Sequence, residues 1–241
     1  MSLTRLVIPG LFLRVGVITA DKEFARHAKV LRLRPGDDLI LCDGAGREMQ
    51  GKLVTLSADE LCVELTHELT PSKAERVAQI TLLQGIPKGD KMELILQKAT
   101  ELGVSRIVPV AMSRSVAKYD KNPPRWEKII QEAARQSGRT TLPSLEVVTS
   151  FAAAITRWVV PGSSFLLDET GEGARLREAL PKEASEVLAL IGPEGGVAPA
   201  ERRASLEAGF IPVSLGTRIL RTETAAITIA ALLQHYYGDL G

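Results

Sequence analysis

The sequence has few of the residues that build metal centres or disulfide frameworks. Its 241 residues include only two cysteines, Cys42 and Cys62, and three scattered histidines, His27, His67 and His235. Both cysteines lie in apparent strands, and together they offer neither a disulfide framework nor a metal-binding cluster. We therefore expect two buried thiols in a reducing compartment, and no metal site.

Long hydrophobic runs and familiar nucleotide-binding motifs are missing as well. No run approaches 18 apolar residues, and proline, glycine and arginine interrupt the apolar residues at the N-terminus. We expect no membrane span, no signal peptide and a cytoplasmic protein. The chain has no P-loop, no GxGxxG with a downstream acid and no serine nucleophile elbow. These absences argue against a dinucleotide-dependent oxidoreductase and against a serine hydrolase.

The charges are balanced overall but uneven along the chain. The formal net charge is +1, yet residues 1–34 and 114–139 are rich in lysine and arginine, whereas residues 37–68 are acidic. Two separated basic stretches in a nearly neutral protein are typical of a local contact with a polyanion such as RNA or DNA. Two solvated helix faces would explain the same pattern.

The chain has two successive regions that differ in their pattern of predicted strands and helices. Residues 1–72 are rich in short apolar strands, with one helix beginning after Asp21, and they predict a small β-barrel that serves as a nucleic-acid platform. The pattern changes at a predicted linker over residues 70–79. From residue 73 to 241, apolar strands alternate with helices, which predicts an α/β domain with a mostly parallel sheet.

Three consecutive strand ends of this second region carry small and polar residues. The stretches are LLDETGEG (166–173), LIGPEGG (190–196) and LGTRILRTETA (215–225). Ligands of open α/β sheets bind beyond the carboxyl ends of the strands, and glycine allows a ligand to approach bare backbone. Ile219 and Leu220 are apolar although they lie in a loop. They pack against an adenine face, against another subunit, or simply close the core.

Together these motifs resemble a known family. The stretches KGDKMELILQKATELGV, EAARQSGR, LIGPEGG and LGTRILRTETAAI, in this order, are similar to the ribosomal RNA small subunit methyltransferase E (RsmE) family of the SPOUT superfamily. The resemblance covers the chain from about Gln84 onward and is looser before it. It implies a PUA-like β-barrel followed by a SPOUT α/β domain whose chain, from roughly residue 190 to 241, forms a trefoil knot. It also implies that S-adenosylmethionine (SAM) binds in the knot, and that a homodimer methylates N3 of one uridine in 16S ribosomal RNA, either naked or in the small ribosomal subunit.

The resemblance nominates site residues position by position. The residues expected to contact the cofactor are Leu167, with the neighbouring acids of LLDE, and Gly192, Pro193, Glu194, Gly195, Gly196, Leu215, Gly216, Ile219, Leu220, Arg221, Thr224 and Ala225. Thr217 stands where proline is common in the family, which is the one small departure from these motifs.

Methylation of uridine N3 sets chemical demands of its own. The base must be splayed out because N3 lies on its pairing edge, and N3 must lose a proton. Arg221 is the candidate donor to a uracil oxygen, and Glu223 the candidate base. Arg221 could instead form an ion pair with Glu223 or Glu194, and Glu223 could serve only the helix dipole. Ionisation without a dedicated base is a further alternative.

RNA phosphates require cations near the catalytic edge. Lys88, Lys91, Arg114 and Arg139 lie in loops after a strand or a helix, and we expect them to contact RNA. Two rival functions stay open at this point. One is a SPOUT methyltransferase for another RNA, such as a tRNA 2′-hydroxyl, and the other is an RNA-binding assembly factor without catalytic activity.

Overall fold

The computed structural model describes residues 3–69, 78–116, 119 and 121–240. Residue contacts divide the chain into two compact units, of which the first also includes residues 134–142. This second stretch of the first unit was not anticipated from the sequence. The predicted boundary between residues 72 and 73, and all of the predicted linker except residues 78 and 79, lie outside the described residues.

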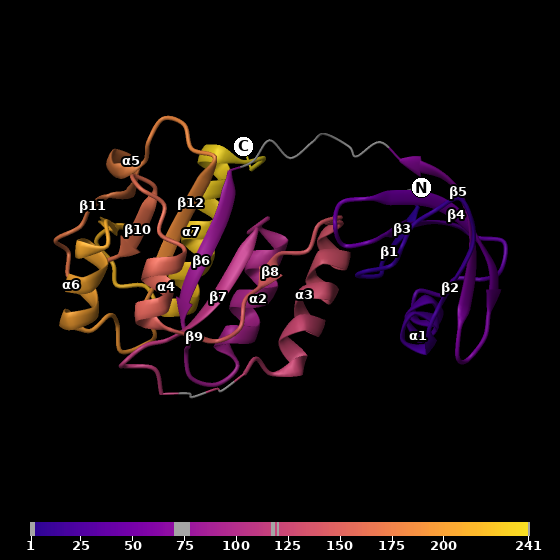
Figure 1. Ribbon diagram of the computed structural model, residues 1–241, viewed down its shortest axis with the longest axis horizontal. Helices are drawn as coiled ribbons and strands as arrows, with labels where there is room; N and C mark the ends of the chain where they lie inside the picture. Colours follow the sequence, from indigo (N-terminus) through magenta and orange to yellow (C-terminus); the bar gives the residue numbers. More distant parts are fainter. Residues whose placement is uncertain (1–2, 70–77, 117–118, 120, 241) are drawn as a thin grey trace. The chain divides into compact units, whose positions relative to one another are not determined.

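The N-terminal unit is a five-stranded sheet with one helix (Figure 1). Its elements are β1 (Thr4–Val7), β2 (Gly16–Ala20), α1 (Lys22–Val30), β3 (Asp38–Cys42), β4 (Glu48–Leu56) and β5 (Leu61–Leu69). The strand order is β1-β3-β4-β5-β2, with only the β1–β3 pair parallel. The core of this unit includes Leu39, Leu41 and Val63 from the sheet and Ala25 and Ala28 from α1. The helix predicted after Asp21 and the short apolar strands predicted for this region are confirmed.

Local chemistry sets both ends of α1. Asp21 is the N-cap, as predicted, and its carboxylate accepts a hydrogen bond of 2.9 Å from the backbone N–H of Glu23. The helix ends at Val30, earlier than its apolar pattern suggested, because Arg32 has a φ of 58°. A residue in this left-handed region cannot continue a right-handed helix.

The second unit is an α/β layer structure in which every strand pair is parallel (Figure 1). The strand order is β11-β13-β10-β12-β6-β7-β8, and β9 pairs with β7. Its elements are β6 (Gln79–Gly85), α2 (Lys91–Glu101), β7 (Arg106–Ala111), α3 (Pro124–Ser137), β8 (Ser144–Leu145), β9 (Thr149–Ser150), α4 (Phe151–Arg157), β10 (Ser164–Leu167), β11 (Ala174–Arg175), α5 (Leu176–Ala179), β12 (Glu186–Ile191), α6 (Pro199–Glu207), β13 (Ile211–Ser214) and α7 (Thr222–Tyr237). The predicted alternation of strand and helix with a parallel sheet is confirmed.

Helices cover both faces of this sheet. Residues of α4 and α6 pack with Leu83, Val108 and Leu188 on one face. On the other face, α7 packs against β6 and β12 and contacts α2. The C-terminal helix therefore lies on the central strands, and the knot stays a prediction.

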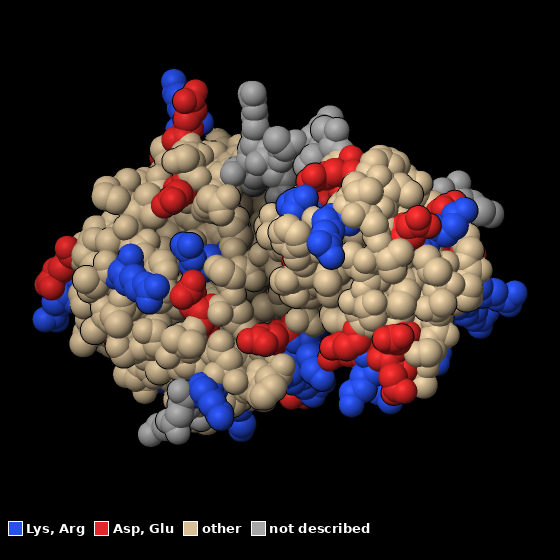
Figure 2. Space-filling model, turned by 45° about the vertical axis from the view of Figure 1, so that its right-hand side comes forward, with Lys and Arg blue, Asp and Glu red and all other residues tan. Residues whose placement is uncertain are grey.

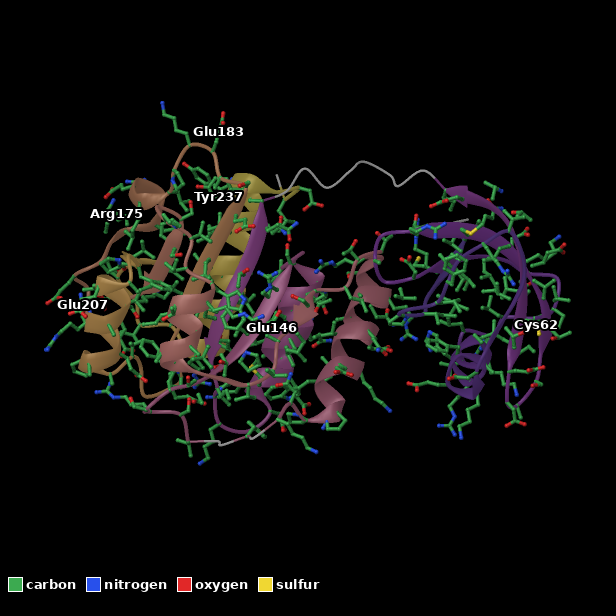
Figure 3. All side chains as sticks on the ribbon, viewed as in Figure 1. Cys62, Glu146, Arg175, Glu183, Glu207 and Tyr237 are labelled. Atoms are coloured by element: carbon green, nitrogen blue, oxygen red, sulfur yellow. The ribbon has the colours of Figure 1, made fainter. Side chains whose placement is uncertain are left out.

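The segment from residue 144 to 157 had no assigned elements. Its strands β8 and β9 have two residues each and α4 has seven, which is too short for a clear apolar period. Glu146, which is labelled in Figure 3, lies in this segment and forms ion pairs with Arg106 at 3.5 Å and Arg157 at 3.9 Å. None of the described helices is both long and apolar enough to cross a bilayer.

Candidate cofactor-binding site

A cavity of about 440 Å³ opens where three neighbouring parallel strands end. Its walls are the segments that follow β10, β12 and β13, which lie side by side in the order β13-β10-β12. The start of α7 and Lys91 of α2 complete the lining. The volume is within the range of small-molecule sites, and the position is where ligands of α/β sheets bind.

Most of the residues nominated for the cofactor line this cavity. All of them do so except Gly195 and Thr224. The carbonyl oxygen of Gly195 instead accepts a hydrogen bond of 2.7 Å from Nη1 of Arg114, and Thr224 is exposed in the first turn of α7. Ile219 is 80% exposed, so its side chain lies uncovered at the rim.

The glycines of LIGPEGG are explained by a tight turn. The backbone N–H of Gly196 donates to the carbonyl of Pro193 at 2.9 Å, and Gly196 has a φ of 71°. A Cβ atom at Gly192 would lie 2.9 Å from the carbonyl carbon of Gly196. The turn therefore folds back on itself, and only glycine fits at both positions.

A buried hydrogen-bond chain ties this turn to two distant parts of the sequence. The hydroxyl of Thr222, at the start of α7, donates to the carbonyl of Gly192 at 2.6 Å. The same hydroxyl accepts from Nε2 of Gln84, in β6, at 2.9 Å. Gln84 is fully buried, and Nε2 also donates to the carbonyl of Gly85. The chain fixes the Gly192 carbonyl relative to the helix that closes the cavity.

Glu194 is held by the loop that precedes α2. Its carboxylate accepts from Nζ of Lys91 at 2.7 Å and from the backbone N–H of Lys88 at 3.0 Å. Burial raises the pKa of Glu194, but the hydrogen bonds from Lys91 and from the backbone outweigh it, so the pKa lies below its ordinary value. Glu194 therefore stays ionised and connects the turn to α2.

A second ion pair supports the opposite wall. Asp168, directly after β10, accepts hydrogen bonds of 3.0 and 2.7 Å from Nε and Nη2 of Arg202, on α6. Burial raises the pKa of Asp168, but the hydrogen bonds from Arg202 and Thr170 lower it by a larger amount. The pKa therefore lies below its ordinary value. Asp168 is thus a fixed anion whose charge Arg202 balances.

The two predicted catalytic residues occupy different environments. Arg221 is exposed, lines the cavity and is the N-cap residue of α7. Glu223 is half-buried and does not line the cavity. Its Oε2 atom is buried without a hydrogen-bond partner and lies 3.8 Å from Nζ of Lys91. Arg221 is therefore placed to meet a substrate, whereas Glu223 faces Lys91.

The four cations nominated for RNA are not equally available. The Lys88 side chain is exposed, but Lys91 pairs with Glu194 and Arg114 holds the Gly195 carbonyl. Arg139 is half-buried in the stretch that groups with the N-terminal unit. On the face shown in Figure 2, basic and acidic side chains are interspersed rather than gathered by sign.

The cavity also includes residues that sequence reasoning did not single out. They are Lys91 as a wall residue, Gly171, Ile191, Val197, Val213, Ser214, Thr217, Arg218 and Thr222. Five of them, Gly171, Ile191, Thr217, Arg218 and Thr222, lie inside the three strand-end motifs, and Val197, Val213 and Ser214 lie within two residues of one. Taking each of these motifs as a whole, with two residues on either side, would therefore have found all but Lys91. Lys91 was nominated for RNA contact and not as a wall residue, because its partner Glu194 is distant in sequence.

The lining fits an adenosyl cofactor. Leu167, Val213 and Leu220 offer apolar surface for a flat ring, and the glycine turns expose backbone groups for its polar edge. Arg218 and Glu169 supply charges of opposite sign for a zwitterionic amino-acid moiety. The residues present therefore suit SAM, which carries all three groups.

Comparison with known proteins agrees with this geometry. The RNA methyltransferase domain family matches residues 73–234, and the RNA methyltransferase PUA domain family matches residues 21–66. A ribosomal RNA small subunit methyltransferase E from Bacillus subtilis is 37% identical over 218 residues, with 86% of this chain and 84% of that protein covered. The chain belongs to the ribosomal RNA small subunit methyltransferase E family.

Other members of the family are similar over the same extent. The protein of that name from Mycobacterium bovis is 31% identical, covering 88% of this chain and 83% of the relative. The crystal structure of the family member from Neisseria gonorrhoeae bound to SAM matches with a TM-score of 0.92 at 33% identity, and both chains are covered completely. The fold of the whole chain is therefore that of a family member whose structure contains SAM.

Proposed function

We propose that this protein uses SAM to methylate N3 of a uridine in 16S ribosomal RNA. The observation that supports this most strongly is the cavity built by three strand-end segments, whose lining coincides with the motifs shared with the family. The names of the relatives favour ribosomal RNA over transfer RNA. The presence of all nominated cofactor residues except Gly195 and Thr224 in the cavity wall favours an enzyme over an assembly factor without activity.

The wall residues bind and orient the reactants. When bound, SAM supplies an electrophilic methyl group on a sulfonium sulfur. Leu167, Val213 and Leu220 would hold the adenine ring, and the Gly192–Gly196 turn would present backbone groups to it. Because the Gly192 carbonyl is fixed by Thr222, the turn keeps its shape while a ligand is bound. A wall that keeps its shape would hold the cofactor in one orientation relative to an incoming base.

Arg221 and Glu223 serve the uracil base. As the N–CH₃ bond forms and the S–CH₃ bond breaks, N3 loses its proton and negative charge develops on the uracil oxygens. Arg221 donates hydrogen bonds to one of these oxygens. Glu223 is the weaker candidate for the proton acceptor, since its Oε2 atom is buried beside Lys91, and water can accept the proton instead.

The remaining assignments complete the proposal. We assign RNA recognition to residues 1–72 and catalysis to residues 73–241, and we expect Lys88 and the nearby cations to contact phosphates. The protein is proposed to act in the cytoplasm as a homodimer. A second copy would cover apolar side chains that are open in this chain, namely Ile219 at 80%, Tyr236 at 52% and Leu232 at 40% exposure.

A nucleoside digest tests the proposal. The purified protein is incubated with methyl-labelled SAM and either 16S RNA, small ribosomal subunits or transfer RNA, and the products are separated as nucleosides. We expect label in 3-methyluridine from 16S RNA or from subunits only. Label in a 2′-O-methyl nucleoside, or in transfer RNA, would overturn the assignment.

Arg221→Ala tests the mechanism within the same assay. Turnover at saturating SAM should fall by about 100-fold, as for the loss of one transition-state donor, and this fall should exceed any rise in the Kd for SAM. Arg203→Ala, which removes an exposed arginine of α6 outside the cavity, is the matched control. Unchanged turnover in Arg221→Ala would remove Arg221 from the mechanism.

A further inference from the structure

Glu169 lies against the turn that forms one side of the cavity. It follows β10 in the segment that leads to β11, and it lines the cavity. A Cβ atom added to Gly196 would lie 2.6 Å from Cδ of Glu169 and would overlap its carboxylate. The carboxylate therefore packs against Gly196, and a side chain at that position would displace it.

Among the described residues, Glu169 has no basic partner of its own. Each of the other two carboxylates of the lining has a basic partner, since Glu194 pairs with Lys91 at 2.7 Å and Asp168 pairs with Arg202 at 2.7 Å. Lys91 also lies 3.8 Å from Glu223, and Arg202 also pairs with Glu172 at 2.9 Å. In the part of the chain that the structure describes, no lysine or arginine forms an ion pair with Glu169. Glu169 is thus the lining carboxylate that leaves a negative charge for a ligand.

The two forms of the cofactor differ by one charge. SAM has a sulfonium and an ammonium cation, whereas the product, S-adenosylhomocysteine, keeps the ammonium but has a neutral thioether. A nearby uncompensated carboxylate attracts the first more than the second. We propose that Glu169 determines this preference, so that the cavity favours SAM and releases the product. The proposal rests on SAM being the cofactor, as assigned above.

Binding measurements without RNA test this role. Calorimetry gives the Kd of SAM, of S-adenosylhomocysteine and of sinefungin, a SAM analogue that carries an amine in place of the sulfonium centre. In Glu169→Gln, the preference for SAM over S-adenosylhomocysteine should fall by about two- to five-fold, the size expected for a partly screened charge. Sinefungin should lose affinity as SAM does. In the unsubstituted protein, but not in Glu169→Gln, added salt should reduce the preference.

Two further variants separate charge from shape. Glu169→Asp keeps the charge and should retain most of the preference. Glu172→Gln removes an exposed carboxylate of the same segment that pairs with Arg202 and does not line the cavity, and it should leave the preference unchanged. An unchanged preference in Glu169→Gln, or an equal fall in Glu172→Gln, would overturn the proposal. Because no RNA is present, the result does not depend on which nucleotide is methylated.

Discussion

Thr222→Val isolates the hydrogen-bond chain that links β6, the glycine turn and α7. Valine has nearly the shape of threonine, so the change removes a hydroxyl and little else. Thr222 is 6% exposed and Gln84 is fully buried, and a Gln84 N–H that loses its only acceptor costs about 1–3 kcal/mol. Gly192 is half-buried, so water replaces part of what its carbonyl loses. We expect the free energy of unfolding to fall by about 2–3 kcal/mol.

Thr222→Ser is the matched control, because it keeps the hydroxyl and removes one methyl group. It should cost about 1 kcal/mol. Both tryptophans, Trp126 and Trp158, lie in the second unit, so their fluorescence reports the unfolding of that unit alone. The midpoint of thermal unfolding should fall by about 4–12 °C for Thr222→Val, at about 2–4 °C per kcal/mol, and by less for Thr222→Ser. SAM affinity should fall in the valine variant only. If Thr222→Ser lowers the free energy of unfolding as much as Thr222→Val does, the methyl contact matters and the argument from the hydroxyl is wrong.

Three further predictions concern backbone, pH and thiols. Gly196→Ala should lower both stability and SAM affinity, since alanine at a φ of 71° costs about 1–2 kcal/mol and its methyl group overlaps Glu169. Adding Glu169→Ala should restore part of the lost thermal midpoint. If the midpoint does not recover, the overlap is unimportant. The lowered pKa of Glu194 contributes stability that is present above the ordinary value of 4.5 and is lost as the pH falls through the lower folded value. In urea titrations from about pH 6 to about pH 3, the free energy of unfolding should therefore fall more for the unsubstituted protein than for Glu194→Gln. Parallel falls in the two proteins would contradict this prediction. Burial and the neighbouring Glu48 raise the pKa of Cys42 to about 12, whereas Cys62 is half-exposed; a thiol reagent at about pH 8 should modify Cys62 alone in the native protein and both cysteines after denaturation, and rapid reaction of both would show that the first unit opens readily.

Local patterns in the sequence predicted much of the fold, and distant pairings explain what they missed. The N-cap at Asp21 and the strand before Gly192 follow from neighbouring residues, and the structure confirms both. The ion pair between Lys91 and Glu194 could not be predicted, because about a hundred residues separate them and either could have faced solvent. The grouping of residues 134–142 with the first unit depends on a packing partner near Gly44, which periodicity cannot reveal.

For the cavity, too, local patterns could be predicted and distant pairings could not. Its loops were identified because glycine and apolar loop residues are unusual in themselves, as at Ile219. Glu223 was nominated from its position beside Arg221, but only the structure shows that its carboxylate turns toward Lys91. The direction of a side chain depends on what surrounds it, and a single sequence does not contain that information.

The dependence of the cavity on α7 has a consequence for biosynthesis. A ribosome delivers the walls after β10 and β12 well before it delivers Thr222 and the helix that follows. Until residues up to Tyr237 have emerged, the nascent polypeptide lacks one side of its ligand pocket and cannot gain stability from the ligand. The pocket can therefore form only after the ribosome has delivered α7, and a nascent chain that lacks this helix cannot compete for the methyl donor.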